Sequence, residues 1–267
     1  MSQHTEIRPG SEPEIEPGGR GRRPPSDGPM TYEQFLDWLD EDTLAEWGDG
    51  KVVMASPAKL KHQNIGKFLI TLLSFFTDVH ELGTIIGPPF QMRLATSGRE
   101  PDVLFLAAAH LDRLKETYLD GPADLVVEVV SPESGARDRG DTFYEYRAAG
   151  IPEYWLIDPD LRQAEFYQLD AAGRYQVVAA GADGIYRSRA LPGFWLREEW
   201  LWQEPLPDVV RTLLEIDGAA YAAYLREKLR QAGQQQFSDQ RDRPLVPDTA
   251  RRPRGYSPGR PRWTHLR

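Results

Sequence analysis

Residues 124–158 read DLVVEVVSPESGARDRGDTFYEYRAAGIPEYWLID, and the expected fold is built outward from this stretch. Leu125–Val130 is a short apolar run rich in β-branched residues, which is typical of a strand buried on both faces. Asp138–Ala149 has helical spacing, and Gly150 is placed to end that helix. Tyr154–Ile157 is a second apolar run. The stretch therefore predicts a strand, a turn, a helix and a second strand.

Two acids occupy unusual places in the apolar runs. Glu128 interrupts the first buried strand, and Pro101-Asp102 immediately precedes another apolar run, Val103–Leu106. A buried carboxylate is costly unless it is paired or binds a cation. Two acids on neighbouring strands can meet at one edge of a sheet, where each raises the pKa of the other. Oxygen ligands without a thiolate favour Mg²⁺ or Mn²⁺ over Zn²⁺. The alternative interpretation of Glu128 is a structural carboxylate that a nearby arginine neutralises.

The same residues carry a resemblance to a known superfamily. Pro101-Asp102, Glu128 within VVEVVSPES, and the segment DRGDTFYEYRAAGIPEYWLID resemble the PD-(D/E)XK restriction-endonuclease-like proteins. They are most similar to the bacterial family named putative restriction endonucleases, formerly a domain of unknown function. The resemblance covers Thr31 to Trp202. It implies an α/β fold, a mixed β-sheet flanked by helices, and hydrolysis of phosphodiester bonds with Asp102 and Glu128 holding Mg²⁺ or Mn²⁺.

The resemblance extends to two further residues. Glu46 lies just before the turn of a predicted β-hairpin, where an acid in this family joins the metal site; the alternative is an exposed hairpin residue. His62 lies in the first turn of a long amphipathic helix predicted over Leu60–Val79. The family places a histidine near the active site here. The alternative is that His62 belongs to a solvated helix face with Lys59 and Lys61.

The chain departs from the family at the catalytic lysine. The usual E-x-K pattern would put this lysine at Val130, and the more similar branch would put it at Thr142. No lysine occurs anywhere in residues 116–227. Arg139 or Arg137 can supply a positive charge from the same segment, and Arg139 is carried forward as a catalytic candidate. Neither can act readily as a base, because guanidinium stays protonated.

Composition limits the classes of protein to which the chain can belong. The chain has 267 residues, of which 40% are hydrophobic, and these suffice for a substantial core. It has no cysteine, which excludes disulfides and cysteine zinc sites and fits a reducing, cytoplasmic location. No apolar run approaches the roughly 18 residues of a membrane span, so no membrane association is expected. The net charge of −9 argues against a strongly nucleic-acid-binding surface.

The remaining pattern divides the chain into four segments. Residues 1–30 are expected to be a disordered tail, 31–204 the restriction-endonuclease-like domain, 205–236 a helical extension, and 237–267 a disordered tail rich in Arg and Pro. Within the domain, the sequence predicts an N-terminal helix capped by Thr31, the hairpin that carries Glu46, and one mixed sheet. The strands of that sheet are expected within 84–94, 102–106, 125–130, 154–157, 163–169, 175–179 and 191–195.

Two functions from different classes follow. The first is a Mg²⁺-dependent endonuclease that hydrolyses DNA, with Asp102, Glu128 and Glu46 at the metal and His62 and Arg139 beside it. The second is a catalytically degenerate family member that acts as a binding or dimerisation module, which the missing lysine favours. A homo-oligomer is expected in either case.

Overall fold

The computed structural model describes residues 28–40, 43, 45–48, 50–54, 59–131 and 134–241. Most of the two predicted tails, 1–30 and 237–267, lies outside the described residues. The chain divides into two compact units, Met1–Ala222 and Ala223–Arg267. All three sheets and the candidate site belong to the first unit.

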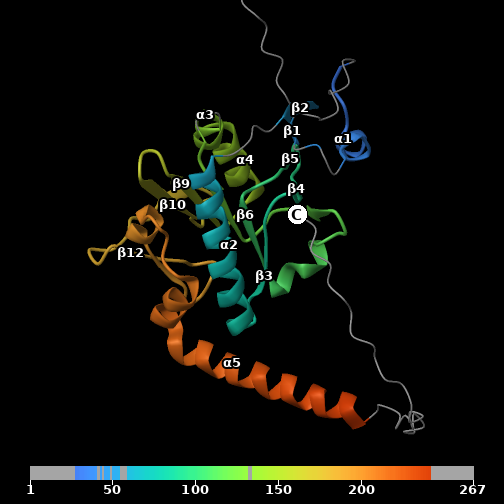
Figure 1. Cartoon of the computed structure of the whole chain (residues 1–267). Coiled ribbons are helices and arrows are strands. Elements are labelled where there is room, and N and C mark those ends of the chain that lie inside the picture. The colour runs from blue at the N-terminus through green and yellow to red at the C-terminus, as the bar shows by residue number, and fades with distance from the viewer. Residues whose placement is uncertain are drawn as a thin grey trace, which may run out of the picture. The chain divides into compact units, whose positions relative to one another are not determined.

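A six-stranded mixed sheet forms the centre of the first unit (Figure 1). Only β8 and β9 run parallel; the other neighbours are antiparallel. The expected α/β fold with a mixed sheet flanked by helices is confirmed. In spatial order the strands are β11 (Tyr175–Val177), β10 (Gln163–Leu169), β9 (Glu153–Asp158), β8 (Leu125–Val129), β6 (Val103–Ala107) and β3 (Gly83–Ile86).

Successive side chains of the central strands point to opposite faces of the sheet and so contribute to two separate apolar layers. Val127 and Val129 of β8 pack with the layer that includes helix α2, Leu60–His80. Val126 and Val130 point to the other layer, as the period of two requires. Figure 1 shows α2 (teal) lying along the sheet in front of β6 and β3. The long helix expected from residue 60 is therefore confirmed, and it covers one face of the sheet.

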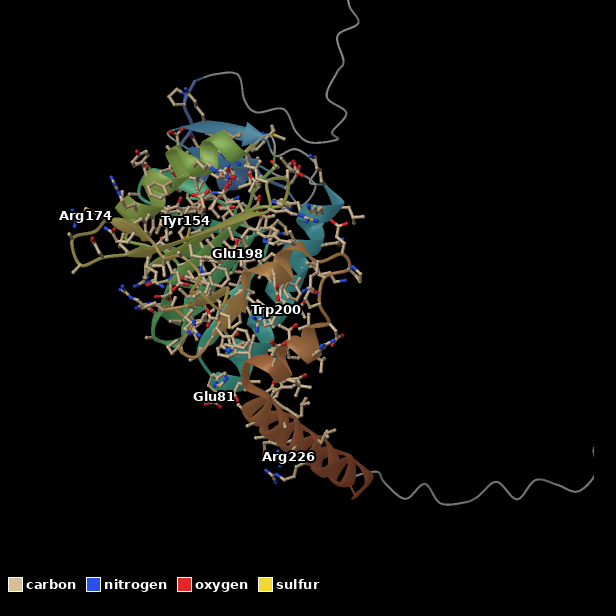
Figure 2. The ribbon with its side chains drawn as sticks, turned by 90° about the vertical axis from the view of Figure 1, so that its left-hand side faces the viewer. Glu81, Tyr154, Arg174, Glu198, Trp200 and Arg226 are labelled. Atoms are coloured by element: carbon tan, nitrogen blue, oxygen red, sulfur yellow. The ribbon has the colours of Figure 1, made fainter. Side chains whose placement is uncertain are left out.

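The connection between β8 and β9 differs from the expectation. One helix was predicted over Asp138–Ala149, whereas the structure has two, α3 (Gly135–Arg139) and α4 (Asp141–Ala149). The break falls at Gly140, which has non-helical backbone angles (φ −110°, ψ −103°). Glycine lacks a Cβ and so has a wider choice of backbone angles than any other residue. Figure 2 shows Tyr154, from β9, among the side chains packed between the sheet and this helical segment.

A second sheet, which was not anticipated as a separate sheet, carries the N-terminal hairpin. Its order is β2-β1-β5-β4-β7. The predicted hairpin is confirmed, with Gly48 opposite Lys51, and so is the capping box of Thr31 on the first helix. These elements are α1 (Tyr32–Trp38), β1 (Ala45–Gly48), β2 (Lys51–Met54), β4 (Gln91–Arg93), β5 (Ser97–Arg99) and β7 (Tyr118–Asp120).

The C-terminal part adds a small hairpin and a long helix. The hairpin consists of β12 (Ile185–Arg187) and β13 (Trp195–Arg197). A 3₁₀ helix, η2 (Glu198–Trp202), follows this hairpin. Another 3₁₀ helix, η1 (Ala108–Arg113), lies earlier in the chain, directly after β6. The last helix, α5 (Val209–Arg241), lies mostly within the expected helical extension, 205–236, continues beyond its C-terminal end, and is interrupted at Asp217 (φ −153°, ψ 73°). Among the described residues no helix has the length and apolar character needed to cross a membrane.

Two glycines give a matched test of this local structure. Gly150 ends α4 with φ +79°, and a Cβ there would meet no atom within 4 Å, so Gly150→Ala isolates the backbone cost. We expect it to lower the free energy of unfolding by about 1–2 kcal/mol. Gly66 lies inside α2 with equally open space, and Gly66→Ala should raise that free energy by about 0.5–1 kcal/mol. Denaturant unfolding of both variants checks the opposite signs.

Candidate functional site

The pairing of β6 with β8 brings the two principal acids together. Val103 lies opposite Val127 in an antiparallel register. Continued by one residue, this register places Asp102, just before β6, opposite Glu128 on β8. The Asp102 Oδ2 atom also accepts a hydrogen bond from the Val129 backbone N–H at 2.8 Å. The two acids that the sequence places on separate strands thus lie at the same end of the sheet.

Glu128 is the most deeply enclosed of the predicted site residues that lie on strands. It is only 9% exposed, and its Oε1 atom accepts a hydrogen bond of 2.6 Å from the Tyr146 hydroxyl on α4. Burial raises the pKa of the Glu128 carboxyl well above its ordinary value, and the negative charges of Asp138 and Asp102 raise it further. Glu128 therefore sits where an added positive charge would be strongly favourable.

Glu46 lies in the same site and is not an exposed hairpin residue. Its side chain is 13% exposed, and its Oε2 atom lies 3.3 Å from Nη1 of Arg99 and 3.2 Å from Nη1 of Arg137. Its Oε1 atom accepts a hydrogen bond from the Glu100 backbone N–H at 3.3 Å. Arg99, from β5, also makes a bidentate contact with Glu145 of α4, at 2.7 and 2.8 Å, and so ties β5, and through Glu46 also β1, to that helix.

His62 reaches the site from α2. Its Nε2 atom lies 3.2 Å from Oδ2 of Asp102, and its side chain is 13% exposed. Burial lowers the pKa of the imidazole, but the hydrogen bond and the charge of Asp102 outweigh it, so the pKa of His62 is raised overall. The Nδ1 atom is buried and has no hydrogen-bond partner among the described residues. His62 is therefore placed beside the acids and not on a solvated face.

Three residues that the sequence analysis did not single out join the site. Asp138 is 3% exposed, and its pKa is raised by burial and by the charges of Glu46 and Asp102. Burial and the same two charges raise the pKa of Glu100 to about 7. Tyr146 is the third, through its bond to Glu128. We call Asp102, Glu128, Glu46, Asp138 and Glu100 the acid cluster.

A sequence signal for part of this set exists. Asp138, Thr142 and Tyr146 are spaced four residues apart, and all three are buried although two are polar. A polar stripe at helical spacing on a buried face points to a site, because buried polar groups need partners. The sequence analysis did not use this stripe.

The arginines are distributed differently from the expectation. Arg139 pairs with Asp158 at 3.1 Å and with Glu165 at 3.4 Å, and neither belongs to the acid cluster. Arg137 contacts Glu46 and lies 3.8 Å from Oδ1 of Asp138. The structure therefore brings Arg137, and not Arg139, to the other predicted site residues.

Thr142 occupies the place where the family's lysine is expected. It lies in the first turn of α4, is 2% exposed, and precedes Tyr146 by one helical turn. Side chains four residues apart lie on the same helix face and lean towards the N-terminus. A longer cationic side chain at residue 142 would consequently extend into the layer that holds Glu128.

Glu128→Gln tests the electrostatic state of the site. The unfolded chain releases this proton near the ordinary glutamate pKa of about 4.3, whereas the folded protein retains it to higher pH. The free energy of unfolding therefore falls as pH rises through that window. Glutamine removes the fall and can still accept from Tyr146. We expect a gain of about 1–3 kcal/mol at pH 7 and none near pH 3, measured by denaturant unfolding.

Glu153→Gln is the matched control with the opposite sign. Glu153 is 1% exposed, but four donors hold its carboxylate: the Trp155 indole, the Tyr186 hydroxyl and the backbone N–H groups of Arg189 and Ala190. The amide nitrogen of glutamine is itself a donor and would face donors that now bind a carboxylate oxygen. We therefore expect the free energy of unfolding to fall by about 1–3 kcal/mol. A loss of stability at pH 7 in Glu128→Gln as well would contradict the raised pKa of the Glu128 carboxyl.

Comparisons with known proteins agree with this architecture. The search of solved structures finds a crystal structure described as "a putative nuclease belonging to DUF820" from Anabaena variabilis, with 16% sequence identity and a TM-score of 0.57. The match covers 65% of this chain and 98% of that chain, and at this identity it shows a shared fold. A comparison with curated proteins gives no match.

The scan against family models gives the stronger result. A model named Uma2 and described as "Putative restriction endonuclease" matches residues 32–199. These residues include all the strands of the three sheets, the helices α1 to α4, and every member of the acid cluster. Because the match spans well over half of the sequence, this chain belongs to the Uma2 family of restriction-endonuclease-like proteins.

Proposed function

We propose that this protein is a metal-dependent endonuclease that hydrolyses DNA phosphodiester bonds, with Asp102 and Glu128 as the principal metal ligands. The observation that carries the proposal is the position of these two acids opposite each other, Asp102 just before β6 and Glu128 on β8. Family membership and fold support nuclease activity in general. The metal, DNA as the substrate, a homo-oligomer and a cytoplasmic location are all part of the proposal.

The donor set fits Mg²⁺ or Mn²⁺. Among the described residues no three Asp, Glu or His side chains are already grouped closely enough to hold an ion. Mg²⁺ does not need such a group, because it keeps several waters and is bound by one or two carboxylates together with substrate phosphates. The raised pKa values of Glu128 and Asp138 mark an excess of buried negative charge that a divalent cation would relieve.

Four of the five predicted site residues have a role in this proposal, and Arg139 has none. Asp102 and Glu128 hold the ion, and Glu46 contributes a third carboxylate from β1. The metal, when bound, polarises the scissile phosphate and lowers the pKa of a nearby water. His62 donates to Asp102 and so fixes the orientation of that carboxylate, with its raised pKa favouring the protonated form. Tyr146 holds Glu128 in the same way.

Removal of a ligand tests the proposal. We expect Mn²⁺ binding by calorimetry in the wild type, and a loss of at least about tenfold in affinity in Glu128→Ala and Asp102→Ala. Plasmid nicking on the same preparations should fall by about a hundredfold or more. Glu165→Ala is the control, since among the described residues Glu165 pairs with Arg139 and Tyr167, which lie outside the acid cluster. Unchanged nicking in both ligand variants would refute the metal site.

A second function remains a candidate because of two specific observations. Thr142 stands at the lysine position, and Arg99 and Arg137 already neutralise Glu46 in the metal-free protein. Both favour a degenerate site retained in a binding or dimerisation module. Metal binding that requires Glu128 but gives no nicking by a highly purified sample would support this alternative.

Thr142→Lys distinguishes a weakened site from a lost one. An ammonium group at this position faces the layer of Tyr146 and Glu128 and offsets charge on the phosphate in the transition state. We expect nicking to rise by about tenfold or more. Asp141→Lys adds a lysine at the adjacent, exposed position and should give no such rise. Equal effects of the two variants would mean that general surface charge, and not the site, is responsible.

A further inference from the structure

Arg137 is a cation beside the acid cluster, in a position from which it can contact substrate. Nη1 of Arg137 lies 3.2 Å from Glu46, and Nε lies 3.8 Å from Asp138. The Arg137 side chain is 34% exposed, so the side chain that contacts the acids is also accessible to solvent. Its Nε atom is buried and has no hydrogen-bond partner among the described residues.

The neighbouring arginines are engaged differently. Arg99 has a side chain only 6% exposed and makes short bidentate bonds to Glu145, which fix it as a structural link. Arg139 is as exposed as Arg137, at 35%, but its contacts are Asp158 and Glu165. Of these three arginines, only Arg137 combines contact with the acid cluster and access to solvent.

The geometry of its partners limits how firmly Arg137 is held. The 3.8 Å separation from Asp138 is an ion pair without a hydrogen bond, and the contact with Glu46 is shared with Arg99. Glu46 and Asp138 are also acids that a divalent cation would draw upon. A metal that neutralises them weakens the hold on Arg137 and leaves its guanidinium available to a new anion.

We propose that Arg137 is the phosphate-contacting cation of this site and takes over the electrostatic part of the missing lysine's role. This inference rests on the proposed nuclease function. In the metal-free protein Arg137 balances the charge of Glu46 and Asp138; with metal and DNA bound it donates hydrogen bonds to the phosphodiester. Guanidinium matches phosphate in a bidentate geometry and stays protonated, so Arg137 stabilises negative charge and transfers no proton.

The proposal predicts effects of opposite sign on two ligands. Arg137→Ala removes a positive charge that competes with the metal, so Mn²⁺ should bind severalfold more tightly. The same variant removes a phosphate contact, so DNA should bind more weakly. The slope of the logarithm of the DNA-binding constant against the logarithm of the salt concentration should become shallower by about one unit. A variant that merely misfolds would weaken both ligands together.

The experiment compares full-length variants in three assays. Mn²⁺ binding is measured by calorimetry, binding of a fluorescent DNA duplex by anisotropy in Ca²⁺, and plasmid nicking in Mn²⁺. We expect Arg137→Ala to lose about a hundredfold in nicking and Arg137→Lys to retain most of it. Arg174→Ala removes an exposed cation from the β10–β11 turn, labelled in Figure 2, and should leave all three unchanged.

Thr142→Lys in the Arg137→Ala background is the rescue arm. A lysine from α4 restores a cation to the same layer, so nicking should recover at least in part. Wild-type nicking by Arg137→Ala, or weaker Mn²⁺ binding in that variant, would overturn the inference. Loss of nicking in Arg139→Ala while Arg137→Ala stays active would assign the role to Arg139 instead.

Failure of this inference is separable from failure of the proposed function. Wild-type nicking that needs Glu128 but not Arg137 removes only the role of Arg137. A wild type that neither binds Mn²⁺ nor nicks DNA removes the nuclease proposal, and the role of Arg137 falls with it.

Discussion

The antiparallel register between β6 and β8 is the constraint on which the site depends. It sets Asp102 opposite Glu128 and, through the bond from the Val129 backbone to Asp102, locks the end of one strand to the other. Because successive residues of a strand point to opposite faces, a slip of one residue would exchange the two apolar layers of the sheet. The packing of α2 on one face and α4 on the other therefore fixes the position of the acids.

The carboxylates of the acid cluster are held close together although their negative charges repel one another. Burial and mutual repulsion raise the pKa of Glu128 and Asp138, and the arginines compensate only part of that charge. Such an arrangement costs stability in the free protein. The proposed metal ion would relieve this repulsion. Arg99 serves a different end, since it fixes the N-terminal hairpin to α4 through Glu145.

The break at Gly140 decides which arginine meets the acid cluster. A continuous helix over 138–149 would keep a single axis, whereas the two short helices α3 and α4 set Arg137 against Glu46 and Tyr146 against Glu128. The adjacent Arg139 is directed to Asp158 instead. The choice between two arginines two positions apart was consequently made by local backbone geometry, which residue spacing alone does not reveal.

The sequence by itself determined the two central strands and the helical character of the segment between them, the long helix α2, the N-terminal hairpin and the pair Asp102 and Glu128. These follow from apolar periodicity, turn residues and acids in buried runs, all of which are local signals. The second sheet was decided only by tertiary structure, because strands of three residues such as β5 and β7 carry too little periodicity to identify. The same holds for the acid cluster as a whole: its members come from β1, β8, α3 and the segment before β6, and only long-range pairing brings their charges together.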